Sequence, residues 1–306
     1  MAKKRNKFRD VVELMAARLL FGMIGAFPLR VSMRIGKNIG WTLGNRFPRL
    51  QRTARRNLEI AMPGLSAEQK DRIVRGTFES LGRHLGLASH LLKITKEEVR
   101  ELVDLEGAEN FFSAEKQGKG VLLFTGHFGS WEIFNLLPAA FGYKLHILVR
   151  RIDNPLVERF VDSFRTRFGN ETLDKMRSAR RMYRVLEEGG FLGMLTDLNA
   201  QHREGIFVDF FGVPACTTTS LAKLALKTRV PVVPGFAVWN EDRQRYVVSF
   251  EPAINFAPTG DQDADIRELT IKMTEVIERY VKRFPEQWLW IHKRWNTRPL
   301  GEADLY

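Results

Sequence analysis

The stretch Gly120-Val121-Leu122-Leu123-Phe124-Thr125-Gly126-His127-Phe128-Gly129-Ser130-Trp131-Glu132 decides the fold that this sequence predicts. The apolar residues 121–124 indicate a short buried strand, and the glycines that follow indicate a tight turn. A helix is predicted to begin after this turn, with the acid Glu132 in its opening turn. The stretch therefore predicts a strand–turn–helix unit that carries His127 in the turn.

The same alternation of strands and helices continues along the chain. Strands are predicted at residues 121–124, 145–149, 191–196, 232–238 and 246–250, and helices at 131–141, 155–168, 179–187, 218–227 and 263–284. Apolar strands that alternate with helices predict an α/β fold with a mostly parallel central sheet flanked by helices. Functional sites on such sheets gather at the carboxyl ends of strands, where both His127 and Asp197 are expected.

The residues before this alternation are predicted to be helical. Ser66 and Gln69 form a capping box that starts one helix, and a second helix is expected at 96–102. These segments predict an all-helical N-terminal part of about 110 residues. We divide the chain into a basic, apolar, membrane-associating segment at 1–60 and an α/β domain at 61–306, whose residues 61–115 form a helical lead-in.

Positive charge is concentrated at the N-terminus. The 306-residue chain has a formal net charge of +12, and residues 1–60 hold 14 Lys and Arg against three acids, a surplus of 11. Such asymmetry predicts a polyanionic partner, which is either nucleic acid or an anionic bilayer surface.

An apolar run at 11–29, interrupted by Glu13 and Arg18, accompanies these charges. A helix that spans a bilayer needs about 20 apolar residues, and the uninterrupted part of this run, residues 19–29, is shorter. The run predicts a membrane-associating helix, either an interfacial anchor in the headgroup region or a single span. The alternative is a buried core helix with a solvated basic tail.

The cysteine and histidine content excludes several kinds of site. Cys216 is the only cysteine, so a disulfide framework and a cysteine-rich zinc site are excluded, and a reducing compartment is expected. None of the six histidines lies in an H-E-x-x-H motif. We therefore predict neither a protein-held metal nor a cofactor.

His127 and Glu132 are candidates for acid–base chemistry. A neutral imidazole is a good base near pH 7 when its other nitrogen is held, and a helix N-terminus favours an ionised carboxylate. Glu132 is expected to fold back to Nδ1–H of His127, which leaves Nε2 to take a proton from a hydroxyl of the substrate. Backbone N–H groups around Gly129 are the expected donors to the oxyanion. The alternative is a structural turn histidine beside a helix N-terminal acid.

The motif GHFGSWE (126–132) is followed in order by four further blocks, LVRRIDNP (148–155), GMLTDLNA (193–200), GIFVDFFGVPACTTTSLAKLALKTRVPVVP (205–234) and WLWIHKRWNTRP (288–299). Together they resemble the bacterial lipid A biosynthesis acyltransferase family. These are the late, lauroyl- and myristoyl-transferase-like acyltransferases of lipopolysaccharide assembly, within the lysophospholipid acyltransferase superfamily. The resemblance covers nearly the whole chain.

This resemblance implies an O-acyltransferase of the cell inner membrane, acting at its cytoplasmic face. The family moves a fatty acyl chain from acyl carrier protein, or sometimes acyl-CoA, to a hydroxyl of a lipid A precursor. The implied partners are therefore acyl carrier protein, an inner-membrane glycolipid acceptor and an anionic membrane surface, and not nucleic acid.

The resemblance also implies roles for individual residues. His127 corresponds to the family base and Glu132 to its partner in H-x4-[DE]. Arg150 or Arg151 corresponds to an arginine before Asn-Pro that holds acceptor phosphate or charge on the thioester oxygen; Arg151 stands where the family often has proline. Asp197 matches an acid at a strand end, although Leu198 follows it where glutamine is usual.

Two alternative functions remain at this level. The chain can acylate another membrane lipid, such as a phosphatidylinositol mannoside or a lysophospholipid, or it can be a basic nucleic-acid-binding protein. The aromatic residues Trp288, Trp290 and Trp295 are expected either at the bilayer interface or in a cluster that closes the sheet.

Overall fold

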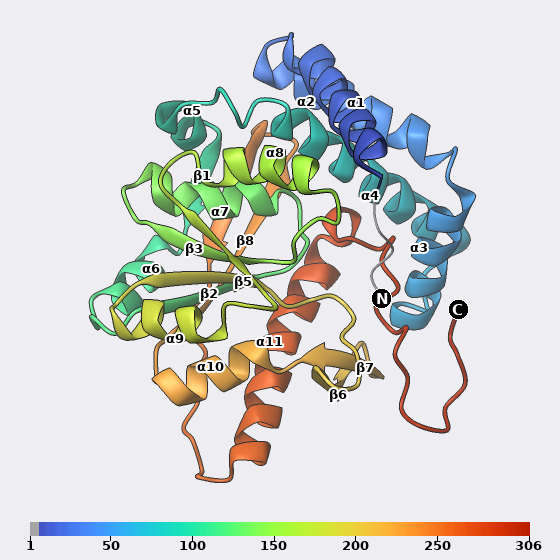
Figure 1. Cartoon of the computed structure of the whole chain (residues 1–306). Coiled ribbons are helices and arrows are strands. Elements are labelled where there is room, and N and C mark those ends of the chain that lie inside the picture. The colour runs from blue at the N-terminus through green and yellow to red at the C-terminus, as the bar shows by residue number, and fades with distance from the viewer. Residues whose placement is uncertain (1–5) are drawn as a thin grey trace.

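The computed structural model describes residues 6–306 (Figure 1). Lys3, Lys4 and Arg5 of the basic N-terminus lie outside the described residues. The helices are α1 (Lys7–Gly25), α2 (Leu29–Gly44), α3 (Pro48–Ala61), α4 (Ala67–Ala88), α5 (Lys96–Glu101), α6 (Ala108–Glu115), α7 (Trp131–Ala140), α8 (Pro155–Arg165), α9 (Ala179–Glu187), α10 (Ser220–Thr228), α11 (Gln262–Arg283) and the 3-10 helix η1 (Pro285–Gln287). The strands are β1 (Val103–Glu106), β2 (Val121–Thr125), β3 (Leu145–Val149), β4 (Glu171–Asp174), β5 (Phe191–Leu195), β6 (Gly205–Phe210), β7 (Val213–Thr218), β8 (Val232–Asn240) and β9 (Arg245–Phe250).

A seven-stranded sheet with the order β1-β9-β8-β2-β5-β3-β4 forms the centre of the molecule. Neighbouring strands are parallel except β8 and β9, which form an antiparallel pair. Helices cover both faces of the sheet, as Figure 1 shows. The predicted α/β class with a mostly parallel sheet is therefore confirmed.

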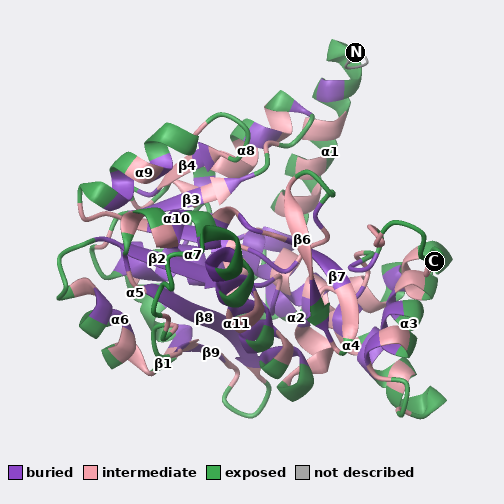
Figure 2. Ribbon diagram, turned by 90° about the horizontal axis from the view of Figure 1, so that it is seen from below, coloured by how far each residue is buried: buried purple, intermediate pink, exposed green. Residues whose placement is uncertain are grey.

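Strand β2 separates two apolar cores, because successive side chains of a strand point to opposite faces. Leu122 and Phe124 pack in one buried cluster with Ile277 of α11. Leu123 packs in the other buried cluster with Leu136 of α7. Figure 2 shows the central strands as the most continuously buried part of the chain. Burial on both faces explains why this strand has an uninterrupted apolar sequence.

Four strands of the structure were not predicted from the sequence. The N-terminal part is not entirely helical, because β1 joins the sheet as an edge strand parallel to β9. Strand β4 forms the other edge, and β6 and β7 form a separate antiparallel hairpin. The edge strands have only four residues each, with the sequences VDLE and ETLD, and so lack the apolar run that identifies a buried strand. Thr218 ends β7, and α10 begins at Ser220.

Helices α2 and α4 approach each other through glycines. A Cβ atom on Gly82 of α4 would lie under 3.0 Å from the backbone of Gly36 and Gly40 in α2, and a Cβ on Gly86 would collide with the backbone at Met33. Only glycine permits this backbone-to-backbone contact. The contact fixes α4 in the molecule, and α4 in turn packs on η1 near the carboxyl edge of the sheet.

Substitution of Gly82 by alanine is expected to destabilise the fold. Alanine favours helix formation over glycine, but its Cβ would force α2 and α4 apart. We expect the free energy of unfolding to fall by about 1–3 kcal/mol, measured by urea denaturation. Gly22→Ala in α1 is the matched control, because a Cβ at Gly22 meets no atom within 4 Å. Equal stability of the two variants would contradict this account of the contact.

Helix α1 presents an apolar surface to the solvent. Only Asp10, Ile24 and Gly25 of this helix are buried, so the alternative of a buried core helix is wrong. The exposed large apolar side chains on and just after it are Phe8, Val11, Val12, Met15, Leu19, Met23 and Phe27. In the described part of the chain, residues 6–306, none of the helices combines the length and the apolar character needed to cross a membrane.

Candidate active site

The turn after β2 holds His127 in a fixed position at the carboxyl edge of the sheet. Gly129 has a φ of 46°, and a Cβ atom there would collide with the carbonyl of Ala237 in β8, so this turn requires glycine. The N–H of Gly129 donates to the carbonyl of Gln287 at 2.9 Å, and the N–H of Ser130 donates to the carbonyl of Ala237 at 3.2 Å. The turn is thereby anchored to both β8 and η1.

Asp197 is the carboxylate that holds His127. Strand β5 pairs in parallel with β2, which brings the residues after both strands to the same edge of the sheet. Oδ1 of Asp197 lies 2.8 Å from Nδ1 of His127, and Oδ2 accepts the backbone N–H of His127 at 2.7 Å. Oδ2 also accepts the indole N–H of Trp288 at 2.8 Å. The predicted position of Asp197 at a strand end is confirmed, and its contact is with the histidine.

The surroundings of Asp197 keep it ionised. Its side chain is buried, and burial alone would raise the pKa. The nearby His127 imidazole and the hydrogen bonds from His127 and Trp288 outweigh this effect, so the pKa of Asp197 lies below its usual value. An ionised Asp197 accepts the hydrogen of Nδ1, and Nε2 is then the nitrogen left for a substrate.

The expected contact between Glu132 and Nδ1 of His127 is wrong. The Glu132 carboxylate instead binds Arg165 of α8, with Oε1 2.6 Å from Nη2 and 3.0 Å from Nε. This bidentate ion pair is largely enclosed, since the Glu132 side chain is 4% exposed and that of Arg165 is 18% exposed. Burial disfavours the charge on Arg165, but Glu132 outweighs burial and raises the pKa of the guanidinium. Glu132 thus holds the guanidinium of Arg165 in a fixed position.

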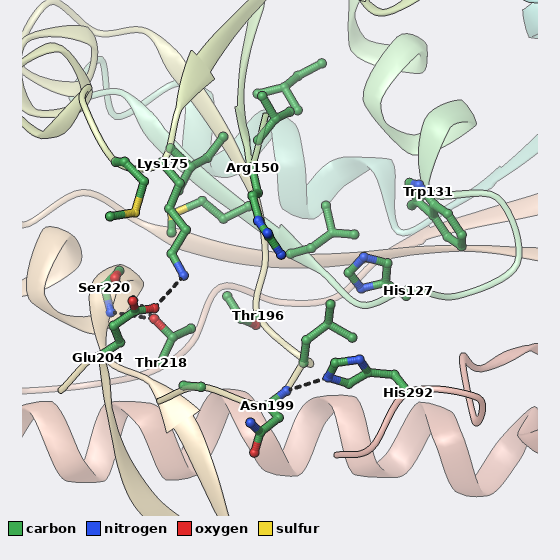
Figure 3. Close-up of a pocket in the computed structure, with 18 of the residues that line it drawn as sticks. His127, Trp131, Arg150, Lys175, Thr196, Asn199, Glu204, Thr218, Ser220 and His292 are labelled. Carbon is green, nitrogen blue, oxygen red and sulfur yellow. Dashed lines mark hydrogen bonds and ion pairs between the residues drawn. The ribbon is translucent and has the colours of Figure 1, made fainter. Parts of the chain in front are cut away.

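A cavity of about 600 Å³ opens beside His127. Figure 3 shows His127, Arg150 and His292 directed toward this space, with Lys175 and Glu204 at its other end. Part of its wall is apolar, formed by Ile147, Leu148, Val149, Met176, Met194, Leu195 and Leu198. Arg165 and Arg203 add positive charge to the wall. The cavity therefore combines an apolar lining with several cations around a histidine.

The structure separates the two candidate arginines. Arg150 lines the cavity with a side chain that is 84% exposed. Arg151 lies outside the lining and binds Glu158 at 2.8 Å, and Glu158 also accepts the backbone N–H of Ile152. The Glu158 carboxylate raises the pKa of Arg151 against the opposing effect of burial. Arg151 therefore holds the start of α8 in place, and Arg150 is the residue available to a ligand.

The proposed role of Gly129 needs correction. Its N–H already donates to Gln287, and the neighbouring N–H groups of His127, Phe128 and Ser130 all have acceptors as well. The N–H groups of residues 127–130 are therefore not available as donors to an oxyanion in this structure. The requirement for glycine at 129 comes from the backbone geometry of the turn.

Sequence reasoning missed Trp288, Arg165 and His84 as residues of the site. Trp288, Trp290 and Trp295 are almost completely buried, so a position at the bilayer interface, one of the two alternatives, is wrong, and the three side chains pack inside the protein. The only signal for Trp288 was its place in the aromatic-basic block at 288–299. Arg165 gave no sequence signal, because its partner lies 33 residues away.

Trp131 lies between two imidazoles. Its ring centroid is 5.1 Å from that of His127 and 4.2 Å from that of His84, which stacks on it. Burial lowers the pKa of His84 to about 4, so this ring is neutral at physiological pH. The Nδ1 atom of His84 lies 3.2 Å from the hydroxyl of Ser130, which caps α7. The stacked rings of Trp131 and His84 support the side of the cavity that borders His127.

His292 is a second histidine in the cavity wall. Its Nε2 accepts the backbone N–H of Asn199 at 3.2 Å, which fixes the segment that follows Asp197. Burial lowers its pKa, so the ring is uncharged near neutral pH. His292 therefore shapes the cavity beside His127 without adding charge.

These features define an α/β protein with a histidine base candidate at the carboxyl edge of its sheet, beside a partly apolar, cationic cavity. The family described as bacterial lipid A biosynthesis acyltransferase matches residues 2–297. The chain belongs to this family, and it is an acyltransferase that acts in lipid A biosynthesis.

Several curated relatives of this chain are named as lipid A biosynthesis acyltransferases. The lipid A biosynthesis palmitoleoyltransferase of Escherichia coli (strain K12) is 28% identical over 288 residues, which cover 91% of this chain and 89% of the relative. The lipid A biosynthesis lauroyltransferase of the same organism is 26% identical, over 93% of this chain and 91% of the relative. A lipid A biosynthesis acyltransferase of Haemophilus influenzae is 24% identical, over 94% and 89%.

Proposed function

We propose that the protein transfers a fatty acyl chain from acyl carrier protein to a hydroxyl group of a lipid A precursor, with His127 as general base. The observation that carries this proposal is the hydrogen bond of 2.8 Å between Nδ1 of His127 and a buried aspartate, beside a partly apolar cavity. Such a bond fixes the tautomer in which Nε2 accepts a proton. The nucleophile is the acceptor hydroxyl, and the step needs no cofactor.

The reaction proceeds by addition and elimination at the thioester carbon. Nε2 of His127 takes the proton of the acceptor hydroxyl as its oxygen forms a bond to the carbonyl carbon. The resulting tetrahedral intermediate then breaks its carbon–sulfur bond. The thiolate of the carrier leaves and takes the proton from the imidazolium, which restores neutral His127. Asp197 stabilises the imidazolium between these two events.

Cations around the cavity supply the charge that this reaction requires. Arg165 lies in the cavity wall, held by Glu132, and is the proposed partner of the negative charge on the carbonyl oxygen. Arg150 extends into the open part of the cavity and is the proposed contact of a phosphate on the acceptor. Apolar side chains such as Met194 and Leu195 are proposed to contact the acyl chain.

The proposed location is the cytoplasmic face of the cell inner membrane, with α1 as an interfacial anchor. The exposed apolar side chains of α1 suit insertion among lipid headgroups and acyl chains. Arg30 and Arg34 in the next helix are exposed and suit contact with anionic lipid headgroups.

A transfer assay tests the function directly. Purified protein, acyl carrier protein loaded with a fatty acid, and membrane lipid containing the lipid A precursor are expected to give a product heavier by one acyl group, detected by mass spectrometry. A lysophospholipid and a phosphatidylinositol mannoside serve as competing acceptors in the same assay. Acylation of one of these acceptors, with the lipid A precursor unchanged, would overturn the proposed acceptor.

A further inference from the structure

A cationic surface borders the mouth of the cavity. The segment at 175–184, KMRSARRMYR, contains five basic residues and no acid, and it leads from the end of β4 into α9. Helix α9 buries Met182, Val185 and Leu186 against the sheet, which leaves its arginines on the outer face. Helix α10 packs beside α9 and adds exposed lysines. We call this surface the α9–α10 cationic face; its residues are Lys175, Arg177, Arg180, Arg181, Arg184, Lys223, Lys227 and Arg229.

Much of this charge is not neutralised within the protein. Lys175 pairs with Glu204 and Arg181 pairs with Glu171. Among residues 6–306, Arg177, Arg180 and Arg184 are exposed and make no ion pair. The acids Glu187, at the end of α9, and Glu188, which follows it, come after the arginines in the chain. Uncompensated charge of one sign attracts a partner of the opposite sign.

The position of this face connects it with the reaction. Lys175 and Met176 line the cavity, and the next residues along the chain lead directly onto α9. Met176 is 70% exposed, so it provides an apolar contact among the cations. A macromolecule bound to the cationic face would therefore sit at the entrance through which a substrate reaches His127.

We propose that the α9–α10 cationic face is the docking site of the acidic carrier protein that delivers the acyl thioester. This inference rests on the proposed function, since that function requires a protein-bound thioester to reach the cavity. Charge complementarity selects an acidic protein surface. The membrane is the less suitable occupant, because the exposed apolar residues suited to it lie on α1. Figures 1 and 2 both show α9 and α1 at well-separated places on the molecule.

The double substitution Arg180→Glu/Arg184→Glu tests this docking site. Both side chains are exposed, neither lines the cavity, and neither makes an ion pair among the described residues, so folding is expected to be retained. We expect the Kd for fluorescently labelled acyl carrier protein and the KM for acyl carrier protein thioester to rise about tenfold or more, with kcat little changed. The difference should shrink as salt is added, because salt screens exposed charges.

Arg279→Glu/Arg283→Glu on α11 is the matched control, with the same spacing and the same change of charge on another helix. Arg279 and Arg283 are exposed and make no ion pair within residues 6–306. We expect this variant to bind acyl carrier protein as the unchanged protein does, and we expect both variants to sediment with anionic phospholipid vesicles to the same extent.

Three results would overturn the docking site. The first is an unchanged Kd for acyl carrier protein in Arg180→Glu/Arg184→Glu, and the second is an equal rise in this Kd for both double variants. The third is a loss of vesicle binding confined to Arg180→Glu/Arg184→Glu, which would assign the face to the membrane. The proposed function fails separately, when the unchanged protein binds acyl carrier protein but makes no acylated lipid.

Discussion

Asp197→Asn is expected to lower kcat by a factor of about a thousand or more, with little change in the KM for either substrate. The oxygen of an asparagine would take the place of Oδ2, where two donors converge from His127 N–H and Trp288. Its NH₂ group would then face Nδ1 of His127 and donate to it. This bond places the hydrogen on Nε2, so the imidazole presents the wrong tautomer to the acceptor hydroxyl.

A double-mutant cycle that combines Asp197→Asn with His127→Ala tests this prediction further. Since the two residues act as one unit, His127→Ala and the double variant should be about as slow as Asp197→Asn, without further loss. Asp265→Asn is the matched control. Asp265 is another buried aspartate that accepts three hydrogen bonds, two from Thr259 and one from Gly260, and it lies outside the cavity. Circular dichroism checks folding. A fully active Asp197→Asn variant would show that Asp197 does not orient the base.

Glu132→Gln is expected to lower the free energy of unfolding by about 3 kcal/mol, because it leaves the charge of Arg165 enclosed without its carboxylate. Turnover should fall as well, since Arg165 loses its fixed position in the cavity wall. Urea denaturation measures the first effect and the transfer assay measures the second. Glu132 is in this view a positioning residue that acts through Arg165.

The double variant Glu132→Gln/Arg165→Met separates this role from a direct role on His127. Removal of both charges should restore most of the lost stability, because no unpaired charge remains. Turnover should stay low, because the cation is gone. If the double variant is as unstable as Glu132→Gln alone, the ion pair is not the source of the stability loss.

The central part of the fold could be predicted from the sequence, and its edges could not. Strands such as β2 and β8 are buried on both faces, so their apolar runs identify them without other information. The edge strands β1 and β4 are short and carry polar side chains, so their identity depends on the neighbours with which they pair. The approach of α2 to α4 likewise depends on a tertiary contact between glycines.

The candidate site shows the same division. Both His127 and Asp197 follow apolar strands, so their places at the carboxyl edge of the sheet could be predicted. Their contact could not, because it depends on the strand order, in which β2 lies next to β5 instead of β3. The spacing H-x4-E favoured a local partner for the histidine. The structure gives that acid a partner in α8, and it gives the histidine an acid that follows β5, 70 positions later in the chain.

The third hydrogen bond to Asp197 has a consequence for the synthesis of the protein. Its donor, Trp288, enters the chain 91 positions after the aspartate, and η1 beside it also anchors the turn that carries the base. During translation, the imidazole therefore gains its full set of supports only after residue 288 has emerged from the ribosome. A nascent chain that has already exposed the apolar surface of α1 would thus reach a bilayer before it is competent to esterify anything there.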